Sequence, residues 1–289
     1  MMMSPLLLAL IYSRKSEDRV QLFGKLSHSV MLSYWTFLPL FCGALVVLGQ
    51  VQTKNRNETE IEPRIVGGTK AKEGQFPHQI SLRLRDEHYC GGVIISNNYV
   101  ITAAHCVKHG NDVPPADLWS IQAGSLLLSS GGVRIPVAEV IVHPEYKTDG
   151  SFDLALLRLQ NSLTFDSNIA AIPLATEDPA VGCSVDISGW GKVSEKGALS
   201  DSLLYVKTTH LSRERCRWWY RRLPETMICL VHPSNKGACF GDSGGPATYN
   251  GKVVGLASLL LTGGCGRAGP DGYQKISTLR SWIVEKAGL

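Results

Sequence analysis

The sequence lacks a strong charge of either sign, since its 289 residues include 29 Lys and Arg against 25 Asp and Glu, for a net charge of +4. An excess this small can come from surface lysines alone and does not indicate a polyanionic partner. The chain also lacks internal repeats and low-complexity segments, so a repeat architecture is not indicated. With 44% hydrophobic residues, it has ample apolar material for a buried core in one or two lobes.

A metal-ligand pattern is also missing from the region that holds most of the eight cysteines. The part of the chain from Cys90 to Cys265 contains no CxxC motif and no Cys/His pattern at the spacing of a zinc site. Disulfide bonds are therefore the better interpretation of these cysteines. They indicate an oxidising compartment.

Long apolar runs are scarce, and the most extended one lies at residues 32–48. Its apolar core, Phe37 to Leu48, begins shortly after Met31 and ends in small residues that suit signal-peptidase cleavage before Gln50. We interpret residues 1–49 as a signal segment with Met31 as the functional start, and the protein as secreted and extracellular. A single membrane span is the alternative, although roughly 17 residues is the lower limit for crossing a bilayer.

Residues 50–64 are polar, show no helical or strand periodicity and carry the glycosylation sequon Asn57-Glu58-Thr59. This segment is typical of an exposed, short pro-peptide. From Ile65 onward, short apolar runs alternate with Gly, Pro, Asn and Asp, a pattern that predicts an all-β sandwich or barrel. The clearest of these runs are Gln79–Leu84, 92–95, 137–142 and 253–261.

The C-terminal segment breaks this pattern. Leu279, Ile283 and Ala287 share one side at helical spacing, with charged residues between them, and Gly288 follows as a stop signal. The sequence therefore predicts a helix at the end of the chain.

Three motifs carry side chains that are typical of nucleophilic catalysis. Ser243 lies in a glycine-rich run whose backbone can form a sharp turn, His105 follows Thr-Ala-Ala, and Asp153 is embedded in an apolar run. Each alone has an ordinary structural interpretation: a loop, a structural histidine, and a buried carboxylate that needs a partner. Together they explain one another as nucleophile, base and orienting carboxylate.

With these motifs, the chain resembles the chymotrypsin-like (trypsin superfamily) serine peptidases. The resemblance rests on five motifs in the family's order and covers residues 65–289. They are Ile65-Val66-Gly67-Gly68, the His105 motif, the Asp153 motif, Ser188-Gly189-Trp190-Gly191 and Gly241-Asp242-Ser243-Gly244-Gly245-Pro246. The resemblance implies an all-β fold of two antiparallel six-stranded β-barrels, at about 65–180 and 181–276, with the active site between them and a C-terminal helix at about 277–288.

The resemblance also implies roles for individual residues. Ser243 would attack the peptide carbonyl, His105 would take and return the proton, and Asp153 would hold the imidazole. The backbone amides of Gly241 and Ser243 would form the oxyanion hole.

An activation step is implied at Arg64-Ile65. Cleavage of this bond by a trypsin-like peptidase would free an ammonium group on Ile65, which would pair with the buried carboxylate of Asp242.

The family's disulfide pattern implies three bridges here. They are Cys90–Cys106, Cys216–Cys229 and Cys239–Cys265. Cys183 stands where relatives bridge to a position that is Tyr249 in this chain, so we expect a free thiol, with a bond to another chain as the alternative. Cys42 would be lost with the signal segment.

No cofactor and no metal site are expected. Some relatives bind calcium through an acidic loop before the segment that here begins at Val140. The matching residues 124–138 contain no Asp or Glu, so the oxygen ligands that calcium requires are missing.

Substrate preference depends on four pocket residues. By resemblance, Gly237 occupies the base of the primary pocket, where an aspartate would select Arg or Lys, and Ser258 and Leu260 form the facing wall. Leu260 would narrow the pocket, which favours an apolar side chain before the cleaved bond, as in chymotrypsin- or elastase-like enzymes. The alternative is trypsin-like preference through Asp271, which can project into the pocket.

The stretch 213–222 combines arginines with aromatic residues. A glycosaminoglycan or nucleic-acid site is one interpretation. The one we favour is a solvated surface helix whose aromatic face packs on the lobe. We therefore expect no nucleic-acid partner. The other expectations are a monomer, protein or peptide substrates, and protein inhibitors as further partners. A binding homologue that has lost activity is the remaining alternative.

Overall fold

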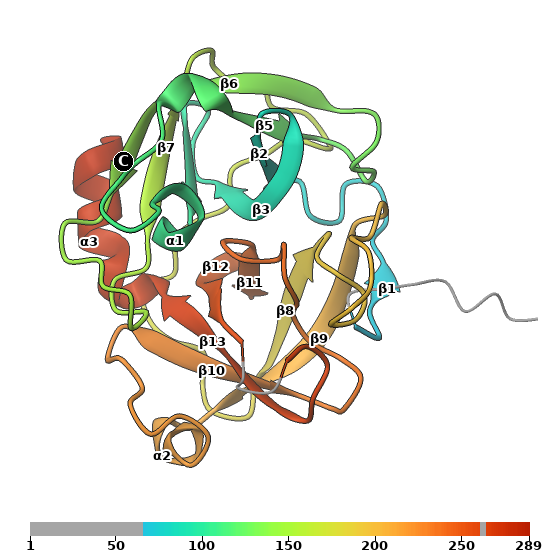
Figure 1. Ribbon diagram of the computed structural model, residues 1–289, viewed down its shortest axis with the longest axis vertical. Coiled ribbons are helices and arrows are strands. Elements are labelled where there is room, and N and C mark those ends of the chain that lie inside the picture. The colour runs from blue at the N-terminus through green and yellow to red at the C-terminus, as the bar shows by residue number, and fades with distance from the viewer. Residues whose placement is uncertain (1–65, 261–263) are drawn as a thin grey trace, which may run out of the picture. The chain divides into compact units, whose positions relative to one another are not determined.

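The computed structural model describes residues 66–260 and 264–289 (Figure 1). The expected signal segment (1–49), the pro-peptide (50–64) and both residues of the activation bond, Arg64 and Ile65, lie outside the described residues. In the described part of the chain, no helix has the length and apolar character needed to cross a bilayer.

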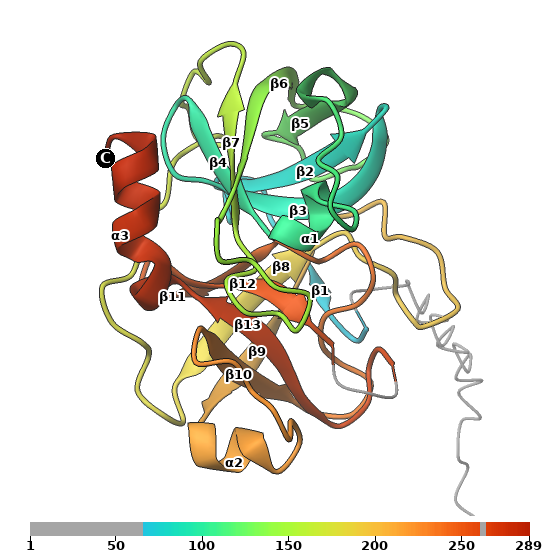
Figure 2. The ribbon, with the colours of Figure 1, turned by 60° about the vertical axis from the view of Figure 1, so that its left-hand side comes forward.

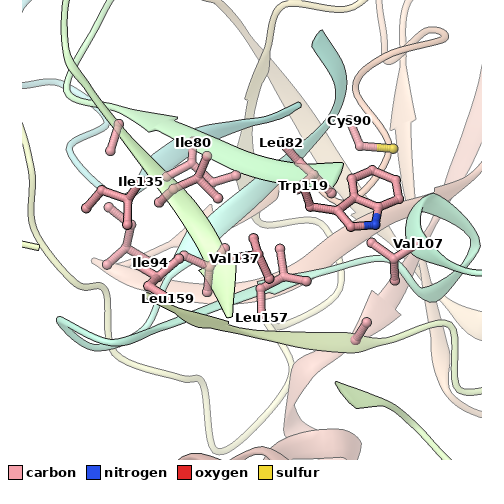
Figure 3. Packing of buried hydrophobic residues seen from close by; sticks show 14 of the residues in the cluster. Ile80, Leu82, Cys90, Ile94, Val107, Trp119, Ile135, Val137, Leu157 and Leu159 are labelled. Atoms are coloured by element: carbon pink, nitrogen blue, oxygen red, sulfur yellow. The ribbon is translucent and has the colours of Figure 1, made fainter. Parts of the chain in front are cut away.

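The first half of the described chain forms a closed antiparallel β-barrel in the order β2-β3-β4-β7-β6-β5. Its strands are β2 (Gln79–Leu84), β3 (Glu87–Ile94), β4 (Tyr99–Thr102), β5 (Trp119–Ala123), β6 (Val133–Val142) and β7 (Ala155–Leu159). Apolar side chains from all six strands fill the barrel, as Figure 3 shows for Ile80, Leu82 and Trp119. Because successive side chains of a strand point to opposite faces, this interior uses mainly alternate positions.

The second half forms another barrel. Its strands are β8 (Ser184–Gly189), β9 (Leu204–Leu211), β10 (Met227–His232), β11 (Pro246–Tyr249), β12 (Lys252–Leu259) and β13 (Gly269–Lys275). They are hydrogen-bonded in the order β9-β10-β13-β12-β11-β8, and the pairing of β8 with β9 closes the ring. The short strand β1 (Thr69–Lys70) adds to the outer edge of β9.

Helix α3 (Ile276–Ala287) lies against both barrels (Figure 2). Ile276, Leu279 and Ile283 are buried in one cluster with Leu156 of the first barrel and Leu256 of the second. The helix ends at Gly288, whose positive φ of 68° permits the left-handed cap. The predicted fold of two six-stranded barrels and a C-terminal helix is therefore confirmed.

The helical segments between strands are short: α1 (Ala104–Val107), the 3-10 turn η1 (Ala116–Leu118) and α2 (Arg213–Arg217). Helix α2 covers only half of the arginine-rich stretch. Trp218 and Trp219 are 79% and 47% exposed. The expectation that an aromatic face packs on the lobe is therefore wrong for both tryptophans, and only Tyr220 turns inward, donating to the carbonyl of Pro270 at 2.9 Å.

Candidate active site

His105 and Asp153 form a directed pair in the first barrel. His105 lies in α1, directly after β4, and Asp153 lies just before β7, the strand that pairs with β4. The ring Nδ1 of His105 donates to Asp153 Oδ2 at 2.7 Å, and the backbone N–H of His105 donates to Asp153 Oδ1 at 2.8 Å. Asp153 is 1% exposed. This buried carboxylate fixes the orientation of the His105 ring and leaves the opposite ring nitrogen, Nε2, without a bond to the carboxylate.

Two residues of the second barrel complete the surroundings of Asp153. Ser258 donates its hydroxyl to Asp153 Oδ2 at 2.5 Å, and the side-chain amide of the buried Gln274 donates to Ser258 Oγ at 3.3 Å. Gln274 also donates to the carbonyl of Gly150 at 2.6 Å. Sequence reasoning placed Ser258 only in the pocket wall and missed Gln274, because nothing in their local sequence indicates a contact with a carboxylate of the other barrel.

The Ser243 loop is held against the segment that carries His105. The carbonyl of Ser243 accepts from the amide of Gly91 at 2.8 Å, and Gly91 is next to Cys90, whose disulfide partner Cys106 follows His105. Gly244 has a φ of +74°, and a Cβ there would overlap Thr102 and lie 2.8 Å from the amide of Ala103. The absence of a side chain at Gly244 therefore lets the two barrels approach at this point.

The carbonyl of Gly241 is fixed by a histidine that the sequence motifs did not indicate. His88 Nε2 lies 3.1 Å from this carbonyl, and His88 Nδ1 lies 2.8 Å from Ser81 Oγ. Since a carbonyl only accepts, Nε2 carries the proton and Nδ1 accepts from Ser81. Burial lowers the pKa of His88 to about 4, so the ring is neutral at physiological pH and steadies the loop before Ser243.

Asp242, within this loop, has a buried side chain. Its carboxylate accepts from the amides of Gly191 at 2.7 Å and Cys239 at 2.9 Å. Burial raises the pKa of Asp242 to about 7, although both hydrogen bonds act in the opposite direction. A Cβ at Gly189 or Gly191 would overlap this carboxylate, which explains why the Ser-Gly-Trp-Gly motif needs its glycines.

A hollow beside Ser243 brings together most of the predicted pocket residues. It is lined by Ala238, Cys239, Ser243, Ala257, Ser258, Leu259, Leu260, Asp271, Gly272 and Tyr273. Gly237 is not part of this lining. Its Cα instead faces the ring of His232, which a Cβ at Gly237 would overlap.

The pocket carboxylate has a buried partner. Asp271 Oδ2 lies 3.1 Å from His232 Nε2 and accepts from the amide of Ala238, also at 3.1 Å. His232 is separated from Asp271 by 39 positions in the sequence, and no motif pointed to it.

The described residues contain three disulfide bonds: Cys90–Cys106, Cys216–Cys229 and Cys239–Cys265. Cys183 is half-buried and is the free cysteine of the described part of the chain. Its Sγ lies 3.3 Å from the hydroxyl of Tyr249. Cys90, His105 and Cys106 are grouped closely enough to resemble metal ligands, but the bridged sulfurs are not available as thiolates.

This arrangement suits acyl transfer. Ser243 lies on a glycine-rich loop that is hydrogen-bonded to Gly91, next to the disulfide that leads to the His105 helix. A buried carboxylate orients His105, and a hollow lies beside Ser243. Nucleophilic catalysis needs these three functions.

Comparison with known proteins agrees with this chemistry. Residues 65–283 match the family described as Trypsin. "Serine protease SP24D" of Anopheles gambiae is 45% identical over 222 residues, which cover 76% of this chain and 80% of that protein. "Trypsin alpha" of Drosophila melanogaster is 39% identical over 235 residues, covering 79% of this chain and 89% of that protein.

Among solved structures, neuropsin, a serine protease expressed in the limbic system of mouse brain, superposes with a TM-score of 0.70. It is 31% identical, and the match covers 76% of this chain and 98% of neuropsin. The chain therefore belongs to the trypsin family of chymotrypsin-like serine proteases and is a serine endopeptidase.

Proposed function

We propose that the protein is a secreted endopeptidase that is made as an inactive precursor and hydrolyses peptide bonds through Ser243, His105 and Asp153. The observation that carries the proposal is the 2.7 Å bond between His105 Nδ1 and the buried Asp153, next to the loop that holds Ser243. With Nδ1 engaged, the ring can accept a proton only at Nε2.

The reaction then runs in two halves. His105 takes the hydroxyl proton of Ser243 as Oγ attacks the carbonyl carbon, and the amides of Gly241 and Ser243 stabilise the oxyanion. His105 returns the proton to the leaving amine, which leaves an acyl-enzyme. Water, deprotonated by the same ring, releases the acid and restores Ser243. Asp153 stabilises the imidazolium in both halves.

Activation is proposed to follow cleavage after Arg64 by a peptidase that cuts after basic residues. Asp242 supports this proposal, because it is buried beside Ser243 and its raised pKa reflects a carboxylate in need of a cation. Residues 66 and 67, which follow the bond, pack against Gly266 and Asn235 of the second barrel. Pairing the new ammonium of Ile65 with Asp242 would secure the loop, since an unpaired buried charge costs about 3–5 kcal/mol.

For specificity, we propose an apolar side chain before the cleaved bond, supported by Leu259 and Leu260 in the pocket lining. The second candidate is a basic side chain, favoured by the carboxylate of Asp271 in the same lining. Proteins and peptides would be the substrates of a monomeric enzyme, and protein inhibitors its other partners. The disulfides and the relation to trypsins are consistent with secretion.

The test uses precursor expressed from Met31, activated with trypsin, freed of trypsin on a selective inhibitor column and profiled on peptides with Phe, Leu, Ala or Arg before the scissile bond. Ser243→Ala is the control. Cleavage after the apolar residues that disappears in the control supports the proposal. Cleavage only after Arg selects the second candidate, and silence from a chain with a new Ile65 terminus contradicts the proposed enzyme.

A further inference from the structure

His232 is a buried ionisable residue behind the primary pocket. It is the last residue of β10, its side chain is 2% exposed, and it faces Asp271 of the neighbouring strand β13. The carboxylate of Asp271 in turn lines the pocket and accepts from the amide of Ala238, another lining residue. A change at His232 therefore reaches the pocket through a single hydrogen bond.

Both ring nitrogens of His232 face atoms that act as acceptors. Nδ1 lies 3.0 Å from the carbonyl of Pro233, and Nε2 lies 3.1 Å from Asp271 Oδ2. A neutral imidazole has only one N–H and can satisfy only one of them. The observed geometry thus matches an imidazolium that donates from both nitrogens, with its positive charge against the pocket carboxylate.

The ring also occupies the space where a side chain at Gly237 would begin. A Cβ at Gly237 would overlap the ring of His232, and Gly237 has a φ of +117° that disfavours any side chain. No side chain at position 237 can therefore occupy this space, and the His232–Asp271 pair lies there directly behind the pocket lining.

We propose that His232 is a specificity-determining residue, whose protonation balances the charge of Asp271 and so decides whether the pocket accepts an apolar or a basic side chain. The inference rests on the proposed function of this site and deepens it, because it makes the two candidate specificities two protonation states of one pocket. With imidazolium present, the pair is neutral and an apolar side chain binds. Loss of the proton makes the pocket more negative by one charge and attracts Arg or Lys.

The balance of forces on His232 places this proton loss above the ordinary range of histidine. Burial by itself lowers the pKa of His232, but the hydrogen bond and charge of Asp271, with the carbonyl of Pro233, outweigh burial and raise it above the usual 6.5. A rise in pH through this raised pKa removes the positive charge. The preference for basic side chains should therefore increase above about pH 6.5.

Other titratable groups face this pair from the surrounding elements. Tyr220 and Tyr273 both have pKa values raised by burial and then by Asp271, so their phenols stay neutral through the physiological range. Asp242, on the nucleophile loop, also interacts with Asp271. Its titration changes the loop that serves every substrate and therefore cancels in a ratio of two substrates.

Lys236 and His210 are two further charged or titratable residues on adjacent segments of the described chain. Lys236 is exposed, and its stem packs against Gly67. His210, on β9, is buried and bonds through Nδ1 to the carbonyl of Pro179 at 2.7 Å. Since β9 pairs with β10, His210 offers a matched control for replacement of a buried histidine in the same barrel.

The experiment measures kcat/KM of the activated enzyme for two peptides that differ only in Arg or citrulline before the scissile bond, from about pH 5.5 to about pH 8.5. Citrulline has the shape of Arg without its charge. Because both peptides are cleaved by the same catalytic groups, effects of pH on the chemical step cancel in the ratio. We expect the Arg/citrulline ratio to rise by about ten- to a hundredfold across this range, with a midpoint above the usual pKa of histidine.

Three variants test whether the His232–Asp271 pair causes the pH dependence of the ratio. His232→Gln keeps a donor toward Asp271 without a titrating charge, so its ratio should be high and independent of pH. Asp271→Asn removes the anion, so its ratio should be low and independent of pH. His210→Gln should keep the wild-type rise.

Each outcome supports or overturns the inference or the proposed function. A ratio that does not change with pH, in wild-type enzyme that still cleaves through Ser243, overturns the inference but leaves the proposed function standing. A rise of the ratio that persists in His232→Gln has the same two consequences. No cleavage of either peptide or of apolar peptides by a correctly processed chain overturns the proposed function itself. If His232→Gln does not fold, the imidazole resonances of wild-type His232 are followed by NMR. A ring that does not titrate over the same pH range contradicts the inference.

Discussion

The contact between Gly237 and the ring of His232 can be tested quantitatively. Replacing Gly237 with Ala places a side chain at a φ of +117°, which costs about 1–3 kcal/mol in backbone strain. The same Cβ overlaps the ring of His232, and relieving such overpacking in a buried site costs about 1–3 kcal/mol more. The expected loss of stability is therefore about 2–6 kcal/mol.

A double-mutant cycle separates the two costs. In a His232→Ala background the ring is gone, so only the strain of Gly237→Ala should remain, and the coupling between the two sites should be about 1–3 kcal/mol. All four chains carry Ser243→Ala, which prevents self-digestion, and their free energies of unfolding are measured by urea denaturation with the disulfides intact. Because a chain of this size loses about 2–4 °C of melting temperature per kcal/mol, thermal unfolding gives a second measurement.

The coupling decides between the two explanations. An equal cost of Gly237→Ala with and without the His232 ring would refute the overlap, and with it the claim that the ring fills the space next to Gly237. A near-zero cost in both backgrounds would refute the strain as well.

Three further predictions follow from hydrogen bonds and burial. Ser258→Ala removes a hydrogen bond to the charged Asp153, so kcat should fall about 10–100-fold, while an unchanged kcat would contradict its role in holding the carboxylate. Gly191→Ala pushes a Cβ into the carboxylate of Asp242, so kcat/KM of the cleaved enzyme should fall about 10²–10³-fold, comparable to loss of one oxyanion donor, and full activity would contradict the packing. Burial lowers the pKa of His78 to about 4, so His78 contributes about 3 kcal/mol of stability above pH 6.5 that is lost as pH falls towards 4. The urea midpoint of wild type should therefore fall relative to that of His78→Leu over that range, and parallel midpoints would contradict it.

Local signals predicted the all-β class and the C-terminal helix, whereas the arrangement in two six-stranded barrels was implied by the family resemblance. The run Gln79–Leu84 is also the observed strand β2, since its side chains are nearly all buried and uninterrupted. The run at 92–95 marked only the buried end of β3, which begins at Glu87, and the run at 137–142 marked only the second part of β6, which begins at Val133. Their first residues are largely exposed, and hydrophobic patterning does not detect a strand that projects beyond the core.

The triad could be proposed because each member lies in a distinctive motif. The residues that hold the triad and its loop in place could not be predicted, because their roles arise from contacts between distant segments. Gln274 reaches Ser258 across two strands of the second barrel, and His88 meets Gly241 from 153 positions away. A lone histidine in a strand carries no signal of its partner.

The surroundings of the pocket could likewise be predicted only in part. The family resemblance identified Asp271 as a candidate specificity residue, but its partner His232 lies on another strand. Only the spatial arrangement placed His232 behind Gly237.

The most direct test of the central claim is the reaction of the protein with an organophosphorus fluoridate that modifies activated serines, followed by peptide mass spectrometry of precursor and trypsin-activated chain. The account predicts one phosphoryl group per activated chain, located on Ser243, together with an Ile65 terminus, and much slower labelling of the uncut precursor. Rapid labelling of the uncut chain would contradict the proposed activation. A correctly cut chain that remains unlabelled at Ser243 would contradict the catalytic role of the Ser243, His105 and Asp153 site.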